Sequence, residues 1–158
     1  MLIVNQTYSS QQGITLVEAL VAMAIFMLGF GSLYVFFNLS QHSVVESERR
    51  LYLNLMGDRI IQTIAAEAQR SATDPQNPFV TPANYAGSLN VCNYDADDVR
   101  QGWCQDLNTN VGPYNAVSGQ EDRQVNLIND GTGLIVNISF LIADGKVSAY
   151  FTRKLRQL

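Results

Sequence analysis

Few residues in this sequence have the types and spacing that chemistry needs. The chain has one histidine, His42, and two cysteines, Cys92 and Cys104. No carboxylate and nucleophile accompany the histidine, and no Gly-x-Ser-x-Gly motif is present, so nucleophilic catalysis has no set of partners. Two thiols with a histidine far away in the sequence are also a poor set of metal ligands. We therefore expect no enzyme activity, no cofactor and no metal site.

A group of four aspartates near the cysteines could in principle ligate calcium. These are Asp95, Asp97, Asp98 and Asp106. An EF-hand loop would need a glycine where Arg100 stands, so the spacing does not fit that motif. A solvated acidic loop is the favoured interpretation, and calcium binding stays an alternative.

A single carboxylate, Glu18, stands at the start of a long apolar run. From Ala19 to Phe37 there are nineteen residues without a charge or a proline, and only Ser32 and Tyr34 carry a polar group. A carboxylate within such a helix costs on the order of 2.5–3.5 kcal/mol at the bilayer centre. The run is long enough to cross a membrane, which takes roughly 20 apolar residues. The cost of placing Glu18 at the start of this run therefore requires an explanation.

Two other interpretations of the apolar run fit the sequence less well. The apolar core of a secretory signal peptide would follow a basic stretch, but residues 1–12 contain no lysine or arginine. The small-x-small tripeptide Ala22-Met23-Ala24 lies inside the run and not after it. A buried helix of a soluble protein would need other apolar segments to cover it on all sides, and no other segment is apolar enough.

The helical pattern continues beyond the apolar run. From Leu39 to Arg70 there is no proline and one glycine. Apolar residues at steps of seven and four form one stripe, which is typical of an amphipathic helix. The stripe consists of Val45, Tyr52, Met56, Ile60, Ile64 and Ala68. We predict one helix, with residues 14–38 as its transmembrane and assembly half and residues 39–70 as the half that packs on a head domain.

The rest of the chain is expected to hold a loop-rich region and a sheet. Residues 71–123 contain four prolines and both cysteines, and no clear element is evident there. Residues 124–158 contain three alternating strand patterns, at 125–129, 134–142 and 147–155. The sequences Asn129-Asp130-Gly131 and Asp144-Gly145 between them are hairpin turn signals. We predict an α+β fold in which a long N-terminal helix packs against a C-terminal antiparallel β-meander.

Charge and aromatic content favour no ligand class. The net charge of −4 leaves no basic footprint, so we expect no nucleic-acid partner. The one concentration of bases is at Arg153, Lys154 and Arg156. The aromatic side chains of the head could form a binding patch, but we favour packing for them; they are Tyr85, Tyr94, Trp103 and Tyr114.

The hexapeptide Gly13-Ile14-Thr15-Leu16-Val17-Glu18 closely resembles the processing site of type IV pilins and type II secretion pseudopilins. The resemblance implies the type IV pilin fold and a leader peptide of residues 1–13. It implies that a prepilin peptidase cuts after Gly13 and methylates the new amine of Ile14. It also implies that Glu18, as the fifth mature residue, faces the amine of a neighbouring subunit in a filament, which would explain its place in the apolar run.

Within that family, the apolar segment looks most like minor pilins of the PilV type. A minor pseudopilin of a type II secretion system is the alternative. The residues 1–13 lack the usual bases, and residues 14–74 lack the proline that kinks many major pilins. The resemblance implies other minor pilins, the major pilin, prepilin peptidase and inner-membrane assembly proteins as partners. It places the chain in the bacterial inner membrane with the head in the periplasm, and later in the pilus at the cell surface.

The resemblance also bears on the cysteines, because it places the head outside the cytoplasm. An even pair of cysteines in such a segment is expected to be oxidised. A disulfide between Cys92 and Cys104 would close a loop of about a dozen residues and would contribute roughly 3 kcal/mol in the chain-entropy model. Many major pilins join the C-terminal end with a disulfide, whereas both cysteines here precede the terminal strands. We take that as a sign of a minor subunit.

Overall fold

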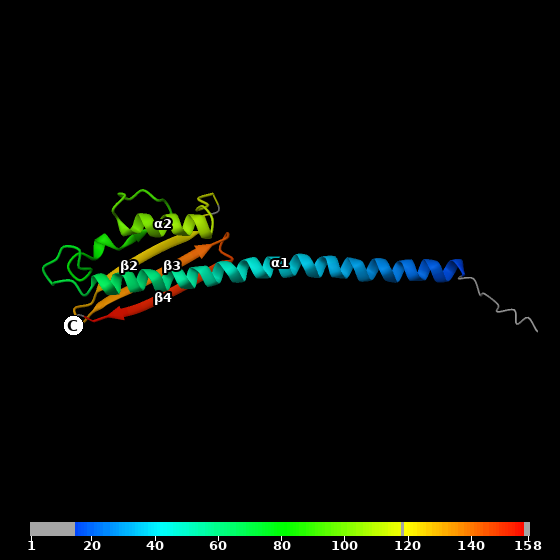
Figure 1. Ribbon diagram of the computed structural model, residues 1–158, viewed down its shortest axis with the longest axis horizontal. Helices are drawn as coiled ribbons and strands as arrows, with labels where there is room; N and C mark the ends of the chain where they lie inside the picture. Colours follow the sequence, from blue (N-terminus) through cyan, green and yellow to red (C-terminus); the bar gives the residue numbers. More distant parts are fainter. Residues whose placement is uncertain (1–14, 118, 157–158) are drawn as a thin grey trace, which may run out of the picture. The chain divides into compact units, whose positions relative to one another are not determined.

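The computed structural model describes residues 15–117 and 119–156 of the chain (Figure 1). The chain divides into two compact units, with the boundary between Ser43 and Val44. Helix α1, Leu16–Glu67, contributes residues to both units. Because each unit has its own contacts, each is described by itself.

The first unit consists of the apolar part of α1, whose start is set by a threonine. The hydroxyl of Thr15 accepts a hydrogen bond from the Glu18 N–H at 3.3 Å, and the Thr15 carbonyl accepts one from Ala19 N–H at 3.1 Å. Threonine is a favoured N-cap residue because its hydroxyl pairs with one of the free N–H groups of the first turn. Helix α1 thus begins at Leu16, within the hexapeptide, with Glu18 in its first turn.

This part of α1 is long and apolar enough to cross a membrane. Its best 18-residue window has a mean hydropathy of 2.2, and none of that window is buried within the protein. Its polar side chains bond to the helix itself: Ser32 donates to the Gly29 carbonyl at 2.8 Å, and Asn38 donates to the Tyr34 carbonyl at 3.1 Å. Such bonds satisfy polar groups where no water is present.

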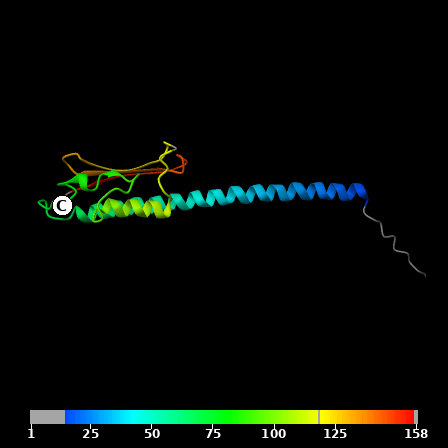
Figure 2. The ribbon, with the colours of Figure 1, turned by 90° about the horizontal axis from the view of Figure 1, so that it is seen from above.

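The second unit has two layers. A four-stranded antiparallel sheet has the order β1, β2, β3, β4, with β1 at Gly87–Ser88, β2 at Asp122–Asn129, β3 at Leu134–Ile142 and β4 at Val147–Leu155. The C-terminal part of α1 and a second helix, α2 at Val99–Asn110, lie side by side on one face of this sheet (Figures 1 and 2). A short 3-10 helix, η1 at Pro82–Asn84, precedes β1. The α+β fold that the sequence predicts is therefore present.

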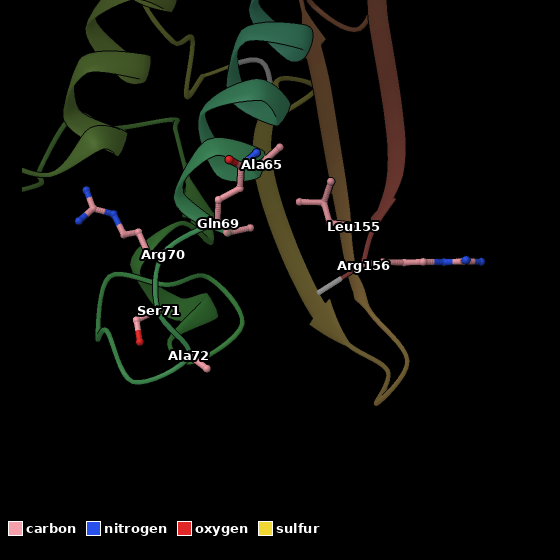
Figure 3. A pocket seen from close by; sticks show the side chains of 8 residues that line it. Ala65, Gln69, Arg70, Ser71, Ala72, Leu155 and Arg156 are labelled. Carbon is pink, nitrogen blue, oxygen red and sulfur yellow. The ribbon is translucent and has the colours of Figure 1, made fainter. Parts of the chain in front are cut away.

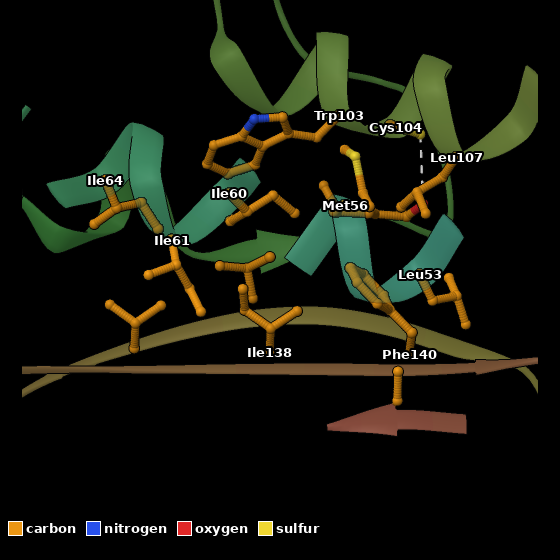
Figure 4. Packing of buried hydrophobic residues seen from close by; sticks show 14 of the residues in the cluster. Leu53, Met56, Ile60, Ile61, Ile64, Trp103, Cys104, Leu107, Ile138 and Phe140 are labelled. Atoms are coloured by element: carbon orange, nitrogen blue, oxygen red, sulfur yellow. Dashed lines mark hydrogen bonds between the residues drawn. The ribbon is translucent and has the colours of Figure 1, made fainter. Parts of the chain in front are cut away.

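The core lies between the two helices and the sheet (Figure 4). Strand β3 alternates strictly, with every second residue buried, as a strand covered on one face must. The predicted stripe on α1 is buried at Met56, Ile60 and Ile64, whereas Val45 is exposed. The largest contributions from each element are Leu53, Met56, Ile60, Ile61 and Ile64 of α1, Trp103, Cys104 and Leu107 of α2, and Val136, Ile138 and Phe140 of β3.

The prediction of a region without regular elements at 71–123 is wrong over Val99–Asn110, which form α2. This helix has few apolar residues, and its N-terminus is capped by Asp98, whose carboxylate accepts from the Arg100 N–H at 2.8 Å. Trp103 and Leu107, one turn apart, anchor it in the core. Most of the stability of so polar a helix comes from packing and not from its propensity, so the sequence pattern does not reveal it.

Two smaller differences concern element ends. The sheet has a fourth strand, β1, which is only two residues long and pairs with Gln124 and Val125. Helix α1 ends at Glu67 and not at Arg70, because the N–H groups of Gln69 and Arg70 bond to carbonyls three residues back. Such tighter bonds are common in the last turn of a helix.

Candidate assembly site

The predicted processing residues, Gly13 and Ile14, lie outside the described residues. The described part begins at Thr15 and includes Glu18, the acid predicted to pair with a neighbouring amine. Glu18 is exposed, and within residues 15–117 and 119–156 no cation pairs with it. A carboxylate in the first turn of a helix is favoured by the positive end of the helix dipole. This carboxylate therefore lies at the start of an exposed apolar helix, with no cationic partner in the part of the chain that the structure describes.

The apolar side chains that follow Glu18 are uncovered. The large hydrophobic residues between Leu16 and Leu39 have exposed fractions of 53–77%. Exposed apolar surface of this extent marks an interaction with a membrane or with other proteins. No titratable side chain lies between Glu18 and Tyr34. This segment can therefore bind lipid tails or other apolar helices, and the single charge at its start would then need a counter-charge.

In the second unit, α1 also leaves one face open. Val44, Leu51 and Leu55 are 60–62% exposed and are spaced by seven and four residues, so they share a face of the helix. At 3.6 residues per turn, this face is opposite the one that carries the buried Leu53 and Ile60. The helix can therefore contact a second apolar surface while its other face remains in the core.

The two cysteines form the disulfide that the sequence predicts. The Cys92 and Cys104 sulfurs are 1.93 Å apart and the Cα atoms 5.4 Å apart. The bond joins the segment after β1 to the buried face of α2, where Cys104 is fully buried. The Asn108 amide donates to the Cys92 sulfur at 3.1 Å, so one further contact holds the same segment to the helix. This prediction is confirmed, and the disulfide positions α2.

Arg123 is a buried charge that the sequence analysis does not identify. Its side chain is 1% exposed and donates to the Asn108 Oδ1 and the Gly112 carbonyl, each at 2.9 Å. The Glu121 carboxylate lies 3.8 Å away. Desolvation by burial lowers the pKa of Arg123, and the nearby Glu121 opposes that shift. The alternation of Arg123 with Val125 and Leu127 along β2 is the one sequence signal that could have placed Arg123 on the buried face.

Two of the four aspartates are bound to arginines. Asp98 binds Arg100 at the start of α2, and this hydrogen bond lowers the pKa of the Asp98 carboxyl. Asp106 binds Arg59 of α1 at 2.6 Å. Among the described residues, no group of three or more histidine, cysteine, aspartate or glutamate side chains is placed to hold a metal ion.

The aromatic side chains of the head mostly pack. Trp103 and Tyr85 are each 4% exposed, so both belong to the core. The Tyr85 hydroxyl donates to the Gln76 carbonyl at 2.7 Å, and Tyr94 stacks under the Arg100 guanidinium at 4.3 Å. The prediction that they pack is confirmed for the two buried residues.

Comparison with known proteins adds one match. Residues 8–34 match the prokaryotic N-terminal methylation motif, which covers the hexapeptide and most of the apolar part of α1. No curated protein and no solved structure matches the chain. The match supports a type IV pilin-like family, whose members are structural subunits rather than enzymes. Together with the apolar helix it suggests membrane anchoring, and it indicates a pilin or pseudopilin that is a substrate of prepilin peptidase.

Proposed function

We propose that this chain is a minor type IV pilin of the PilV type, which primes pilus assembly or is incorporated into the pilus. The observation that carries the proposal is the methylation motif at residues 8–34, which includes most of the exposed apolar part of α1. Cleavage after Gly13 would remove the leader, and methylation would follow on the amine of Ile14. Before assembly the chain would cross the inner membrane once with its head in the periplasm, and afterwards it would lie in the pilus at the cell surface.

In this proposal Glu18 joins subunits. A lone carboxylate in an apolar medium is costly, whereas a carboxylate and an ammonium together satisfy each other. The N-terminal amine of one subunit would therefore form an ion pair with Glu18 of its neighbour. This pair would set the axial step between the two helices. The partner of Glu18 would come from another chain, which agrees with its exposure and with the lack of a cation beside it among the described residues.

The exposed face of α1 in the second unit supports lateral contact between subunits. Val44, Leu51 and Leu55 would pack against the helix of a neighbour, while the opposite face keeps its place in the core. Other minor pilins and the major pilin would provide that surface. Prepilin peptidase and the inner-membrane assembly proteins would act before this contact forms.

A minor pseudopilin of type II secretion would share the processing, the helix and the pairing of Glu18. The two functions predict different effects of deleting the gene. Deletion of the gene should reduce the number of pili and leave the secretion of exoproteins unchanged if the chain is a pilin. The opposite result would assign it to secretion.

The mature N-terminus tests the processing step. Sequencing or mass spectrometry of the protein from its host should find a chain that begins at a methylated Ile14. The variant Gly13→Val should accumulate as the uncut precursor, because a branched side chain does not fit a peptidase site shaped for glycine. A mature protein that begins at another residue would contradict the family assignment.

Substitution of Glu18 tests the pairing. Glu18→Ala should allow membrane insertion and cleavage, because it removes the cost of burying a charge. It should weaken docking by about 3–5 kcal/mol, since the amine of the neighbour would be buried alone. Glu18→Gln is the matched variant: it keeps the size and the capacity to cap the first turn but removes the charge.

The readout is co-purification of full-length minor subunits in detergent, together with pilus number. In both variants the affinity between subunits should fall at least about a hundredfold, because each 1.4 kcal/mol is about a tenfold change. Co-purification should therefore be lost. If Glu18→Gln behaves like the wild type, Glu18 acts as a helix cap and not as an ion-pair partner.

A further inference from the structure

Strand β4 forms one edge of the sheet, and its outer side is unpaired in the described part of the chain. All nine of its residues pair with β3, from Val147 opposite Ile142 to Leu155 opposite Leu134. No other described strand lies beyond it. The opposite edge is different, because β1 covers part of β2 and the Leu89 N–H bonds to the Arg123 carbonyl at 2.7 Å. The β4 edge therefore offers a row of free backbone donors and acceptors.

Soluble proteins usually protect such an edge. The common devices are charged side chains, proline, β-bulges and very short strands. The part of β4 from Val147 to Thr152 has neither a charge nor a proline, and its pairing with β3 continues without a bulge. The lack of these devices over six residues is consistent with an edge that pairs with another chain.

A cleft lies beside the C-terminal end of this edge (Figure 3). It has a volume of about 520 Å³ and separates the last turns of α1 from the end of β4. Ala65 of α1 and Ala68, which directly follows the helix, form part of one wall, and Leu155 of β4 forms part of the other. A strand added beyond β4 would extend the sheet, and the side chains on its helix-covered side would point toward this space. The cleft thus has room for apolar side chains from such a strand.

The charge at the same end of β4 indicates which strand would fit. Arg153 and Arg156 are exposed, and neither side chain has a hydrogen bond or an ion pair among the described residues. Lys154 is different, because its ammonium donates to Asp130 and Thr132, each at 2.6 Å. The chain as a whole has a net charge of −4, so this end of the edge is locally basic on an acidic protein. An acidic side chain on the incoming strand would complement the two arginines.

We infer that the β4 edge and the adjoining cleft bind an extended segment of a neighbouring subunit, which adds a fifth strand to the sheet. The segment would alternate apolar residues, which enter the cleft beside Ala65 and Ala68, with polar ones, and it would carry an acidic residue near Arg153 and Arg156. This inference rests on the proposed function, because the neighbour is another filament subunit. It adds a contact made by the head to the contact made by α1.

Hydrogen exchange of the β4 amides tests this inference. The full chain in detergent is compared with the same chain in sheared filaments, at single-residue resolution. An added strand should slow exchange at least about tenfold at alternate residues of Val147–Leu155, because only every second N–H of an edge strand points outward. Burial under a neighbour without strand pairing would instead slow consecutive amides or none.

A charge reversal provides the control. Arg153→Glu should abolish the alternating protection, whereas Lys146→Glu, which changes the charge equally just before the first residue of the strand, should leave it unchanged. Fluorescence of Trp103 verifies that both variants fold. If the chain is present in filaments but β4 exchanges as fast as in detergent, or without alternation, the inference is wrong. If the chain is absent from filaments, the incorporation named in the proposed function is wrong, and the inference with it.

Discussion

Gly57 offers the sharpest test of how α1 packs on the sheet. It is buried in α1, and a Cβ placed there would lie 2.4 Å from Cε2 of Phe151 and 2.7 Å from two further ring atoms. The partly buried ring packs edge-on against the buried Phe140 with centroids 6.5 Å apart, and a shift away from Gly57 would disturb that contact. The absence of a side chain at residue 57 is therefore what allows the helix to contact β4.

The variant Gly57→Ala sets two effects against each other. Alanine in place of a helix-interior glycine gains about 1 kcal/mol. Overpacking of a filled core costs about 1–3 kcal/mol. Because three ring atoms would lie within 3 Å of the new methyl group, we expect the second effect to exceed the first. The net result should be a loss of about 1 kcal/mol in the free energy of unfolding.

The assay is urea unfolding of the full chain in detergent, followed by fluorescence. Trp103 is the only tryptophan and is buried between the helices and the sheet, so it reports on this unit. Gly102→Ala is the matched control, because Gly102 lies in α2 with no atom within 4 Å of a new Cβ. It should gain about 1 kcal/mol. If Gly57→Ala is stabilised as much as Gly102→Ala, the inference that the Phe151 ring leaves no room for a side chain at residue 57 is wrong.

Two other predictions concern the disulfide and an acidic turn. Reduction of Cys92–Cys104 should lower the free energy of unfolding by roughly 3 kcal/mol, and reductant should have no effect on the double alanine variant. The hydrogen bond from Lys154, helped by those from Thr132, lowers the pKa of Asp130 to about 2. The resulting stabilisation should be complete above about pH 4 and be lost as the pH falls through 2. In Lys154→Met, NMR titration should find this pKa raised toward 3.8 but still below it, because Thr132 still donates; an unchanged pKa would exclude the lysine as the main cause.

The parts of the fold that local patterns encode could be predicted from the sequence. Alternation along 134–142 and the turn signal Asp144-Gly145 predict the hairpin of β3 and β4. The turn spans residues 143–146, and Asp144 and Gly145 have positive φ, as does Ala143 before them. The stripe through Met56, Ile60 and Ile64 gives the face of α1 that lies in the core. These signals repeat every two or every three to four residues, so a single sequence is enough to read them.

The parts that depend on distant contacts could not be predicted. Helix α2 has only a short apolar pattern, and it is held by the disulfide and by core packing. The burial of Arg123 depends on Asn108 and on the Gly112 carbonyl, which belong to the end of α2 and the loop after it. Strand β1 exists only because β2 is beside it. None of these partners has a fixed spacing that a motif could express.

The candidate site follows a different logic from the core. In the second unit, the buried amide of Asn77 and both terminal guanidinium nitrogens of Arg123 have hydrogen-bond partners, and among the described residues only Nε of Arg123 is buried without one. Phe140 and Ile60 are fully buried in the core. Along the apolar part of α1, nothing within the described residues covers the hydrophobic side chains or pairs with the Glu18 carboxylate. Exposure of apolar side chains to water and burial of an unpaired charge both cost free energy. The proposed function therefore needs an apolar medium for the side chains and a counter-charge for the carboxylate. A lipid bilayer satisfies the side chains but not the acid. In the proposed function, a second chain with a cation at the matching depth would satisfy both, and on that proposal Glu18, and not the apolar helix alone, distinguishes an assembling subunit from a simple membrane anchor.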